Sequence, residues 1–433
     1  MTAHTSTEAL AEGRAPGRRS LRPLGGVLAA MAVSSTGTRI SAVALPWFVL
    51  VTTGSTTRTG LVAFCEMVPY VLVKALTGPL VDRAGPRSVS WVSDVVSAIA
   101  VGMVPLLHSL HALSFWLLLV LVAVVGTARG PGDLAKEVMV PEAAERASIP
   151  LERAAGLAGV TERLASTVGP AIGSSAVAFF GPLTALTANA LCFVLGSAVV
   201  MLTLPRRGHA SPAPSLSARP ADSGYWRRFG DGFRFLRTEP LFLIVVVTIC
   251  VTNFLDAALT TLLIPTWARE SGNGPSAIGL TSSVLGFAAV GGSLIAAAAV
   301  HRMRRRVVFF AGFLLAGAPR FLVLAADVPM WAVPTVFAVS GFGVGFLNPI
   351  LGAITFERVP RPLLGRVTAL ADALAWAGIP LGGLVAGAAV TSFGLTAVLL
   401  AGGAAHFLTT ALSALRPEWR GMDTPRGREA LKT

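Results

Sequence analysis

Long apolar tracts recur along the whole chain, and they limit its fold more than any other feature. A helix needs about 20 mostly apolar residues to cross the hydrocarbon core of a bilayer, which is about 30 Å thick. Twelve tracts approach this length, at residues 24–53, 59–80, 88–108, 112–128, 154–179, 183–204, 241–266, 277–300, 307–326, 331–355, 367–390 and 394–415. The sequence therefore predicts an all-α membrane protein with twelve transmembrane helices.

The composition agrees with a chain whose solvent is lipid. Hydrophobic residues make up 53% of the 433 residues and charged residues 13%, whereas soluble domains carry about 25% charged residues. Residues 1–23 hold four arginines and no apolar core, which is unlike a cleavable signal peptide. We therefore expect the first apolar tract to stay as a membrane helix.

The arginines and lysines predict which side of the membrane each connection occupies. With the N-terminus inside, 29 of the 35 fall in cytoplasmic segments, two (Arg58 and Arg269) in outer loops and four within helices. Cytoplasmic segments of membrane proteins carry an excess of these residues. We therefore expect both termini in the cytoplasm of a multi-pass protein of the cell inner (plasma) membrane. The same distribution explains the net charge of +13 without a nucleic-acid partner.

Five segments follow from this pattern. They are a cytoplasmic tail at 1–23, a six-helix bundle at 24–204, a cytoplasmic linker at 205–240, a second six-helix bundle at 241–415 and a cytoplasmic tail at 416–433. Aromatic residues alternate with arginines at 225–235, which predicts an amphipathic helix on the anionic inner leaflet; a calmodulin-like or nucleic-acid segment is the alternative. Two bundles of six helices indicate a duplicated fold with its site at their interface.

The connection between the second and third predicted helices carries a specific motif. Residues 78–87 read GPLVDRAGPR, and their glycines permit a tight reversal. The segment resembles the signature loop of the major facilitator superfamily. The matching positions are Gly78, Leu80, Asp82, Arg83, Gly85 and Arg87, whereas Pro86 replaces a basic residue. The resemblance implies the major facilitator fold and a cytoplasmic latch between the bundles, with Asp94 as the third-helix acid that pairs with the loop.

Further segments resemble the macrolide-efflux and enterobactin-exporter branch of this superfamily. They are residues 43–50 and 53–55, Asn348-Pro349, residues 357–360 and 364–367, and residues 380–383. The resemblance covers residues 24–415. The branch usually has Gly-Asp in its first helix, but this chain has Gly37-Thr38-Arg39, so Thr38 cannot supply that acid.

Residues 169–174, GPAIGS, resemble the antiporter motif of the superfamily. Pro170 removes a backbone hydrogen bond and bends the helix, while Gly169 and Gly173 let a neighbouring helix pack closely. The resemblance favours export; helix packing without a further role is the alternative.

Ionisable residues inside the predicted helices are the main candidates for function, because each is costly in lipid unless it is paired or hydrated. They are Arg39, Glu66, Lys74, Glu162, Arg163, Asp256, Arg320, Asp372 and His406. Arg39 and Asp256 lie at the same depth in the first and seventh helices, which are equivalent in a duplicated fold. We expect the two to meet across a central cavity that also includes Asn253 and Arg320; a structural ion pair is the alternative.

Glu66 is the candidate proton carrier. It lies in the outer half of the second helix and has no obvious partner one helical turn away. Burial favours the neutral form of such a carboxyl group, whereas a nearby cation favours the charged form. We interpret Glu162 and Arg163 as structural, with Arg129 as a candidate partner.

Two further ionisable residues have less specific interpretations. Asp372 lies near the inner surface and is interpreted as part of the latch. His406, in the last helix, is interpreted as a buried polar residue that has a partner.

The motifs of several enzyme classes are missing from the sequence. No Gly-Lys pair occurs, so there is no phosphate-binding loop of the G-x-x-x-x-G-K type. H-E-x-x-H, C-x-x-C and G-x-S-x-G are missing as well. The three cysteines lie in apolar tracts without metal-ligand spacing. We therefore expect neither an enzyme nor a bound metal or cofactor.

Together, the sequence and the resemblance predict a secondary active transporter. The function that fits best is proton-coupled efflux of a drug-like or natural-product substrate by alternating access. The alternatives are a proton symporter that takes up a small metabolite and a transport-inactive membrane sensor or assembly factor. The expected partners are a small-molecule substrate, protons and the lipid bilayer. A monomer is favoured, although the sequence leaves the oligomeric state open.

Overall fold

The structure, a computed structural model, describes residues 21–204, 234, 237–299, 305–359, 364–417 and 419. Every secondary-structure element in these ranges is a helix. The amphipathic helix expected at 225–235 lies outside the described residues, apart from Arg234.

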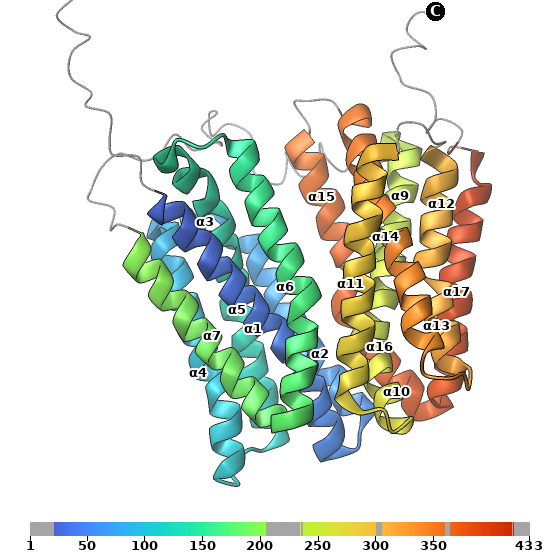
Figure 1. Cartoon of the computed structure of the whole chain (residues 1–433), viewed down its shortest axis with the longest axis horizontal. Helices are drawn as coiled ribbons and strands as arrows, with labels where there is room; N and C mark the ends of the chain where they lie inside the picture. The colour runs from blue at the N-terminus through green and yellow to red at the C-terminus, as the bar shows by residue number, and fades with distance from the viewer. Residues whose placement is uncertain are drawn as a thin grey trace, which may run out of the picture.

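The helices form two halves that stand side by side (Figure 1). The N-terminal half consists of α1 (Arg22–Thr53), α2 (Thr56–Leu76), α3 (Gly78–Ala84), α4 (Pro86–Ser109), α5 (Phe115–Ala147), α6 (Leu151–Phe180) and α7 (Pro182–Thr203). Its core contains the apolar side chains Ala44, Val49, Leu186 and Phe193, which are almost completely buried.

The C-terminal half begins with a long helix that contains a π-helical turn. Its elements are α9 (Pro240–Ala258), the π-helical turn η1 (Leu259–Leu263), α10 (Ile264–Glu270), α11 (Gly274–Ala299), α12 (Arg305–Ala316), α13 (Ala318–Ala325), α14 (Ala332–Arg358), α15 (Leu364–Trp376), α16 (Ile379–Phe393) and α17 (Leu395–Leu415). Trp419 is fully buried and packs against Phe309 and Phe310 of α12. This part of the predicted C-terminal tail is therefore held against the second half.

Nine helical segments of the described chain are long and apolar enough to cross a membrane. α2 and α6 are not among them, because each combines its apolar residues with several charged ones. In α14 the described apolar stretch is Ala332–Leu347, which is shorter than the spans counted here. The structure thus shows a multi-helix membrane protein, while the twelve-span topology stays a prediction.

Two predicted boundaries are wrong. The fourth apolar tract was expected to end at residue 128, but α5 continues to Ala147. The second half of α5 is rich in alanine, glutamate and other good helix formers. Its side chains Asp133, Lys136 and Glu137 contact neighbouring helices, so apolarity underestimates the length of the helix. Residues 78–84, expected as a reversal, form α3; the chain turns at Gly85, whose φ of 81° favours glycine.

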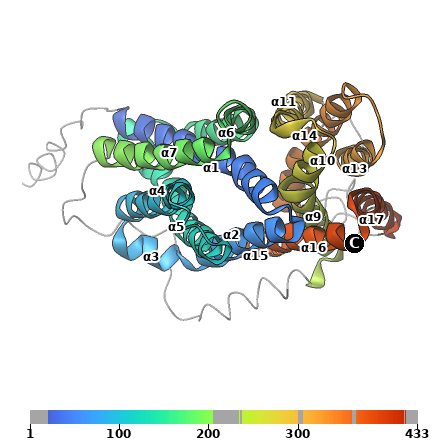
Figure 2. The ribbon, with the colours of Figure 1, turned by 90° about the horizontal axis from the view of Figure 1, so that it is seen from below.

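The two halves meet at one end. In the described residues, the hydrogen bonds between the halves link Thr56 and Thr57 of α2 to Gly387 and Thr391 of α16. A further bond runs from the Ser283 hydroxyl of α11 to the Thr167 carbonyl of α6. Figure 2 shows the two contacts, α2 with α16 and α6 with α11, on opposite sides of α1.

Toward the other end, where α1 begins and α17 ends, the ribbons diverge (Figure 1). α7 ends and α9 begins at this same end of the molecule. The first and last helices of each half therefore begin and end, respectively, at the same end of the molecule. This is the end at which the two halves are farther apart.

Candidate transport site

α2 and α5 run side by side in the same direction and approach closely. Gly126 of α5 lies against the backbone of Glu66, and Gly130 lies against the backbone of Tyr70 and Lys74, so neither glycine has room for a side chain. Small residues permit such close packing of membrane helices. Each helix has a row of polar side chains at four-residue spacing, on one face: Glu66, Tyr70 and Lys74 on α2, and Arg129, Asp133 and Glu137 on α5.

The first two members of each row form a connected group. Arg129 Nη1 donates to Glu66 Oε1 at 2.8 Å, and the Tyr70 hydroxyl donates to Asp133 Oδ2 at 3.3 Å. The Arg129 guanidinium lies 4.5 Å from the centre of the Tyr70 ring. Its Nε is 3.7 Å from Asp133 Oδ2, which is beyond hydrogen-bond distance. Arg129 therefore binds Glu66 directly and Asp133 only loosely.

The third pair connects the rows to the C-terminal half. Lys74 Nζ donates to Glu137 Oε1 at 3.0 Å. The same ammonium group lies 5.9 Å from the centre of the Tyr70 ring and 6.0 Å from that of Trp376. Both distances fit a cation–π interaction. Trp376 is the last residue of α15, next to the break at Ala377 and Gly378 that separates α15 from α16.

A second ion pair links α1 and α6. Arg39 Nη2 donates to Glu162 Oε1 at 2.9 Å, and the Ser35 hydroxyl donates to Glu162 Oε2 at 2.7 Å. Both charged side chains are more than 40% exposed. Solvent screening reduces the contribution of such a pair to stability, so Arg39 and Glu162 can separate at low cost.

A third ion pair is deeply buried between α4 and α5. Lys136 Nζ donates to Asp94 Oδ1 at 2.7 Å, and the two side chains are 4% and 3% exposed. The Ser34 hydroxyl of α1 donates to Asp94 Oδ2 at 3.5 Å. Two paired charges out of contact with water fix the packing of three helices, because either charge alone would be costly there.

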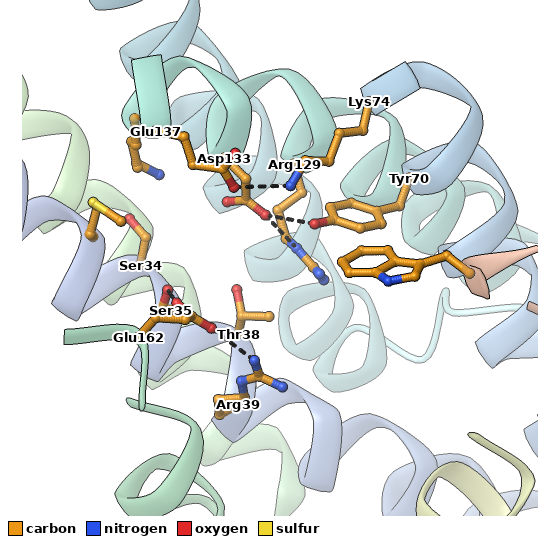
Figure 3. Close-up of a pocket in the computed structure, with 13 residues that line it drawn as sticks. Ser34, Ser35, Thr38, Arg39, Tyr70, Lys74, Arg129, Asp133, Glu137 and Glu162 are labelled. Atoms are coloured by element: carbon orange, nitrogen blue, oxygen red, sulfur yellow. Dashed lines mark hydrogen bonds and ion pairs between the residues drawn. The ribbon is translucent and has the colours of Figure 1, made fainter. Parts of the chain in front are cut away.

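These groups surround one polar pocket of about 260 Å³. It is lined by Met31, Ser34, Ser35, Thr38, Arg39, Tyr70, Lys74, Arg129, Asp133, Lys136, Glu137, Glu162 and Trp376. Figure 3 shows Tyr70, Lys74 and Arg129 on one side of the pocket and Arg39 with Glu162 on the other. Trp376 is the contribution of the C-terminal half, so the pocket lies where the two halves face each other.

The expected meeting of Arg39 and Asp256 is not found. Asp256 accepts a hydrogen bond from Arg320 Nη2 at 2.6 Å, within the C-terminal half, and Arg39 binds Glu162 within the N-terminal half. Each half therefore pairs its own charges. Asn253, one helical turn from Asp256, donates to the carbonyl of Ala375 at 3.0 Å and ties α9 to α15.

The isolation expected for Glu66 is also wrong, because Arg129 from α5 binds it and leaves its side chain 16% exposed. Arg129 was expected near Glu162 instead. The partner of Glu66 is 63 residues away in the sequence, so the local sequence around Glu66 does not reveal it.

The residues of the signature loop lie at the end of the molecule where α1 begins. Arg87 Nη2 donates to the Met201 carbonyl at the end of α7 with a distance of 2.7 Å, and Arg83 is exposed. Asp94 was expected to pair with the loop, but its described hydrogen-bond partners are Lys136 and Ser34. The side chains of Gly78, Asp82 and Asp372 lie outside the description.

The antiporter-like segment packs against both halves. Gly169 lies against the Arg39 side chain and Gly173 against the backbone of Ile40, both on α1. On another face of α6, Pro170 and Ser174 contact Gly279 of α11. Small residues therefore let α6 fit between α1 and the C-terminal half. This arrangement agrees with the packing interpretation of the segment.

Sequence reasoning missed the row on α5. Arg129, Asp133 and Glu137 were assigned to a cytoplasmic connection, although their four-residue spacing matches that of Glu66, Tyr70 and Lys74 on α2. This repeated spacing is the signal that could have revealed the row. For Trp376 no comparable signal exists. In the described residues, no group of three or more His, Cys, Asp and Glu side chains could hold a metal ion.

The pocket is charged, is enclosed by apolar helices and lies where two helical halves face each other. This arrangement is typical of a membrane transporter. Such a pocket provides polar contacts for a small molecule within the membrane-embedded part of the protein, where charged groups are otherwise rare. Residues 24–426 match the family model described as transmembrane secretion effector, which belongs to the major facilitator superfamily. The chain belongs to this family, and it is a multi-pass transporter of the cell membrane and not an enzyme.

Similar proteins of known name cover nearly the whole chain. The multidrug efflux pump Tap of Mycolicibacterium fortuitum is 29% identical over 410 residues, which cover 93% of this chain and 97% of that protein. The pump Tap of Mycobacterium tuberculosis is 31% identical over 403 residues, which cover 92% of this chain and 94% of that protein. These relatives confirm the superfamily resemblance of the signature loop.

Solved structures share the fold. The nucleoside transporter NupG aligns with a TM-score of 0.72 at 14% identity, over 91% of this chain and 98% of that chain. A bacterial homologue of the human lysosomal transporter Spinster, in an inward-facing and unoccupied conformation, aligns with a TM-score of 0.63 at 14% identity. That alignment covers 93% of this chain and 96% of the Spinster homologue. At this identity the likeness concerns the fold alone.

Proposed function

We propose that this protein is a proton-coupled exporter of drug-like or natural-product compounds. The observation that carries the proposal is the charged, half-buried pocket that both halves line. The relatives named multidrug efflux pump support the direction of transport and the class of substrate. The antiporter-like segment at 169–174 supports export as well.

The proposed topology has twelve membrane spans, with both termini in the cytoplasm. The charge distribution of the sequence supports this orientation. In this topology, the end of the molecule where α1 begins and α17 ends faces the cytoplasm. The halves are joined at the opposite, outer end by the threonine cluster of α2 and α16 and by the contact of α6 with α11. The conformation described here would then be inward-facing.

Transport would proceed by rocking of the two halves about the pocket. Opening the outer end requires breaking a few hydroxyl and carbonyl hydrogen bonds, parting small residues and separating Val43 and Trp47 of α1 from the core of the C-terminal half. The hydrogen bonds add little to the cost of opening, because each contributes only about 0.5–1.5 kcal/mol. At the inner end, residues 78–87 and Asp94 are proposed to latch the outward-facing state, and Arg83 is exposed for that role.

Coupling to protons is proposed to involve the ion pairs of the two halves. Glu66 with Arg129 and Asp256 with Arg320 each place a carboxylate against an arginine inside the membrane. A ligand can shift the balance between the two conformations only if it binds them with different affinity. If the distance between carboxylate and arginine differs between the two conformations, the affinity of the carboxylate for a proton or a substrate differs as well. Protons and substrate would then both shift the balance between the conformations.

The experiment compares intracellular accumulation of a compound panel in cells with and without the protein, before and after the proton gradient is collapsed. The proposal predicts lower accumulation of at least one compound with the protein present, and loss of this difference when a protonophore is added. Higher accumulation of a compound in the presence of the protein would instead indicate uptake by symport. No difference for any compound, with the protein present in the membrane, would indicate a transport-inactive sensor or assembly factor.

A further inference from the structure

Among the described residues, the ion pairs around the pocket contain four basic side chains and five carboxylates, three of which line the pocket itself. Four basic side chains line it, and each binds one carboxylate directly; the pairs are Arg39 with Glu162, Lys74 with Glu137, Arg129 with Glu66, and Lys136 with Asp94. Asp133 is the fifth carboxylate of this group. In the described residues, its nearest cation is Arg129, which is already bound to Glu66.

The geometry around Asp133 shows that its charge is poorly balanced. Arg129 Nε is 3.7 Å from Asp133 Oδ2, and this nitrogen is buried without a hydrogen-bond partner among the described residues. The bond that Asp133 does accept, from the Tyr70 hydroxyl, has a length of 3.3 Å. The Asp133 side chain is 30% exposed and lines the pocket, whereas that of Glu66 is 16% exposed and lies outside the lining. Glu137 and Glu162 also line the pocket, but each is hydrogen-bonded to a basic side chain. Asp133 is thus the lining carboxylate without a hydrogen-bonded cation among the described residues.

The other ionisable side chains around the pocket do not balance the charge of Asp133. Among the described residues, the ionisable groups that line the pocket with Asp133 or pair with its lining come from α1, α2, α4, α5 and α6, and they are Arg39, Glu66, Tyr70, Lys74, Asp94, Arg129, Lys136, Glu137 and Glu162. Arg83 of the neighbouring α3 lies outside the pocket lining. A single unbalanced charge inside a membrane protein is costly. A bound proton or a bound cation would remove it.

Two aromatic rings beside Asp133 favour an organic cation. Tyr70 and Trp376 face the pocket from opposite halves of the protein, and the Lys74 ammonium already lies about equally far from both rings. Aromatic faces attract ammonium-like groups and also bind apolar surfaces. A ligand with one positive charge and an apolar body would therefore find a carboxylate and two rings in the same pocket.

We propose that Asp133 is the exchange site of this transporter, and that it binds either a proton or the positive charge of an amphipathic organic cation. This inference rests on the proposed function and specifies its substrate class. When the cation binds, the O–H bond of protonated Asp133 breaks and the proton passes to water in the pocket. The carboxylate then balances the charge of the ligand. Loss of the cation allows a proton to return.

The test measures proton release when a permanent cation binds to the purified full-length protein in lipid nanodiscs. Tetraphenylphosphonium is a suitable probe, because it carries no proton and any released proton must come from the protein. Calorimetric titration in buffers of different ionisation enthalpy gives the number of protons released per bound cation. The inference predicts that wild-type protein releases up to about one proton per cation, with a larger release as the pH is lowered.

The decisive variant is Asp133→Asn, which keeps the size of the side chain and can still accept a bond from Tyr70. It is expected to bind tetraphenylphosphonium about tenfold or more weakly, because a close charge pair is lost, and to release no proton. Glu145→Gln is the matched control, since it removes a negative charge from an exposed position on the same helix, outside the pocket. It should release protons as the wild type does.

A second variant keeps the test decisive if Asp133→Asn does not fold. Trp376→Ala should weaken binding of the probe but leave the number of protons released per bound cation unchanged. Binding without proton release in the wild type, or unchanged release in Asp133→Asn, would overturn the assignment of Asp133. Gradient-driven export of some other compound could still be observed in that case, so the proposed function would survive the failure of this inference.

Discussion

At the scale of single residues, the N-terminal half is organised by ion pairs of different depth. Lys136 with Asp94 is almost completely buried, Arg129 with Glu66 is mostly buried, and Arg39 with Glu162 is close to half exposed. Breaking a buried pair by removing one partner is strongly destabilising, whereas an exposed pair contributes about 0–1 kcal/mol. The deepest pair is therefore expected to be structural, and the shallower pairs can take part in transport.

Asp94→Asn should destabilise the protein by about 3–5 kcal/mol, because it leaves the ammonium group of Lys136 buried without its counter-ion. The double variant Asp94→Leu with Lys136→Met should recover most of this loss, since it removes both charges. The measurement is thermal unfolding in detergent, with Glu145→Gln as an exposed control. A stable Asp94→Asn protein that has lost only transport would show that Asp94 acts in the latch instead.

Glu66→Gln is expected to abolish gradient-driven export while the protein still folds. Without the Glu66 carboxylate, Arg129 can turn fully to Asp133, and the pocket loses its unbalanced negative charge. Transport into reconstituted vesicles with and without a pH gradient measures the effect. Full gradient-driven activity in this variant would place the coupling elsewhere, with Asp256 as the next candidate.

At the scale of helices, the outer contact between α2 and α16 can be tested as a gate. The hydroxyl oxygens of Thr57 and Thr391 are 2.8 Å apart, so cysteines at both positions should form a disulfide bond. In a background without Cys65, Cys192 and Cys250, oxidation should reduce transport about tenfold or more, because the outer end must open in each cycle. Reduction should restore transport, and neither single cysteine should respond. Full activity of the oxidised protein would exclude a gating role for this contact.

The helices also show what the sequence can and cannot predict. The apolar tracts predicted the membrane helices, because helices of twenty apolar residues have few other stable environments. The tracts placed the end of α5 wrongly, since Arg129 and Lys136 face the interior of the half and apolarity alone does not detect a polar interior face. Which charges pair depends on helix rotation and on close approaches such as that of Gly126 to Glu66. Neither can be obtained from one sequence, so Arg39 and Asp256 were paired with each other wrongly.

At the scale of the whole molecule, the two halves meet through small and polar residues on either side of α1, while Val43 and Trp47 of α1 pack into the core of the C-terminal half. Gly279, Thr167 and Ser283 on one side of α1, and Gly60, Gly383 and Thr391 on the other, contribute to these contacts. Trp47 is a large side chain that contacts the cores of both halves. Such interfaces permit one rigid half to move against the other, which is what alternating access requires.

The proposed topology predicts the side of the membrane on which each connection lies. Reporter fusions at residue 215 and after residue 420 should report the cytoplasm, and a fusion near residue 272 should report the outside. The physical reason is the excess of arginine on the side where both halves begin and end. An external C-terminus would contradict the twelve-span topology and the inward-facing assignment together.

The most direct test of proton-coupled export uses purified protein in sealed vesicles with an imposed pH gradient. Vesicles that are acidic inside and contain the protein with its cytoplasmic side outward should accumulate an organic cation against its concentration gradient. Accumulation should stop when a protonophore collapses the pH gradient, and the medium should become more acidic as substrate enters. Substrate movement that is equally fast with and without the gradient, or that leaves the proton concentration unchanged, would contradict proton-coupled export.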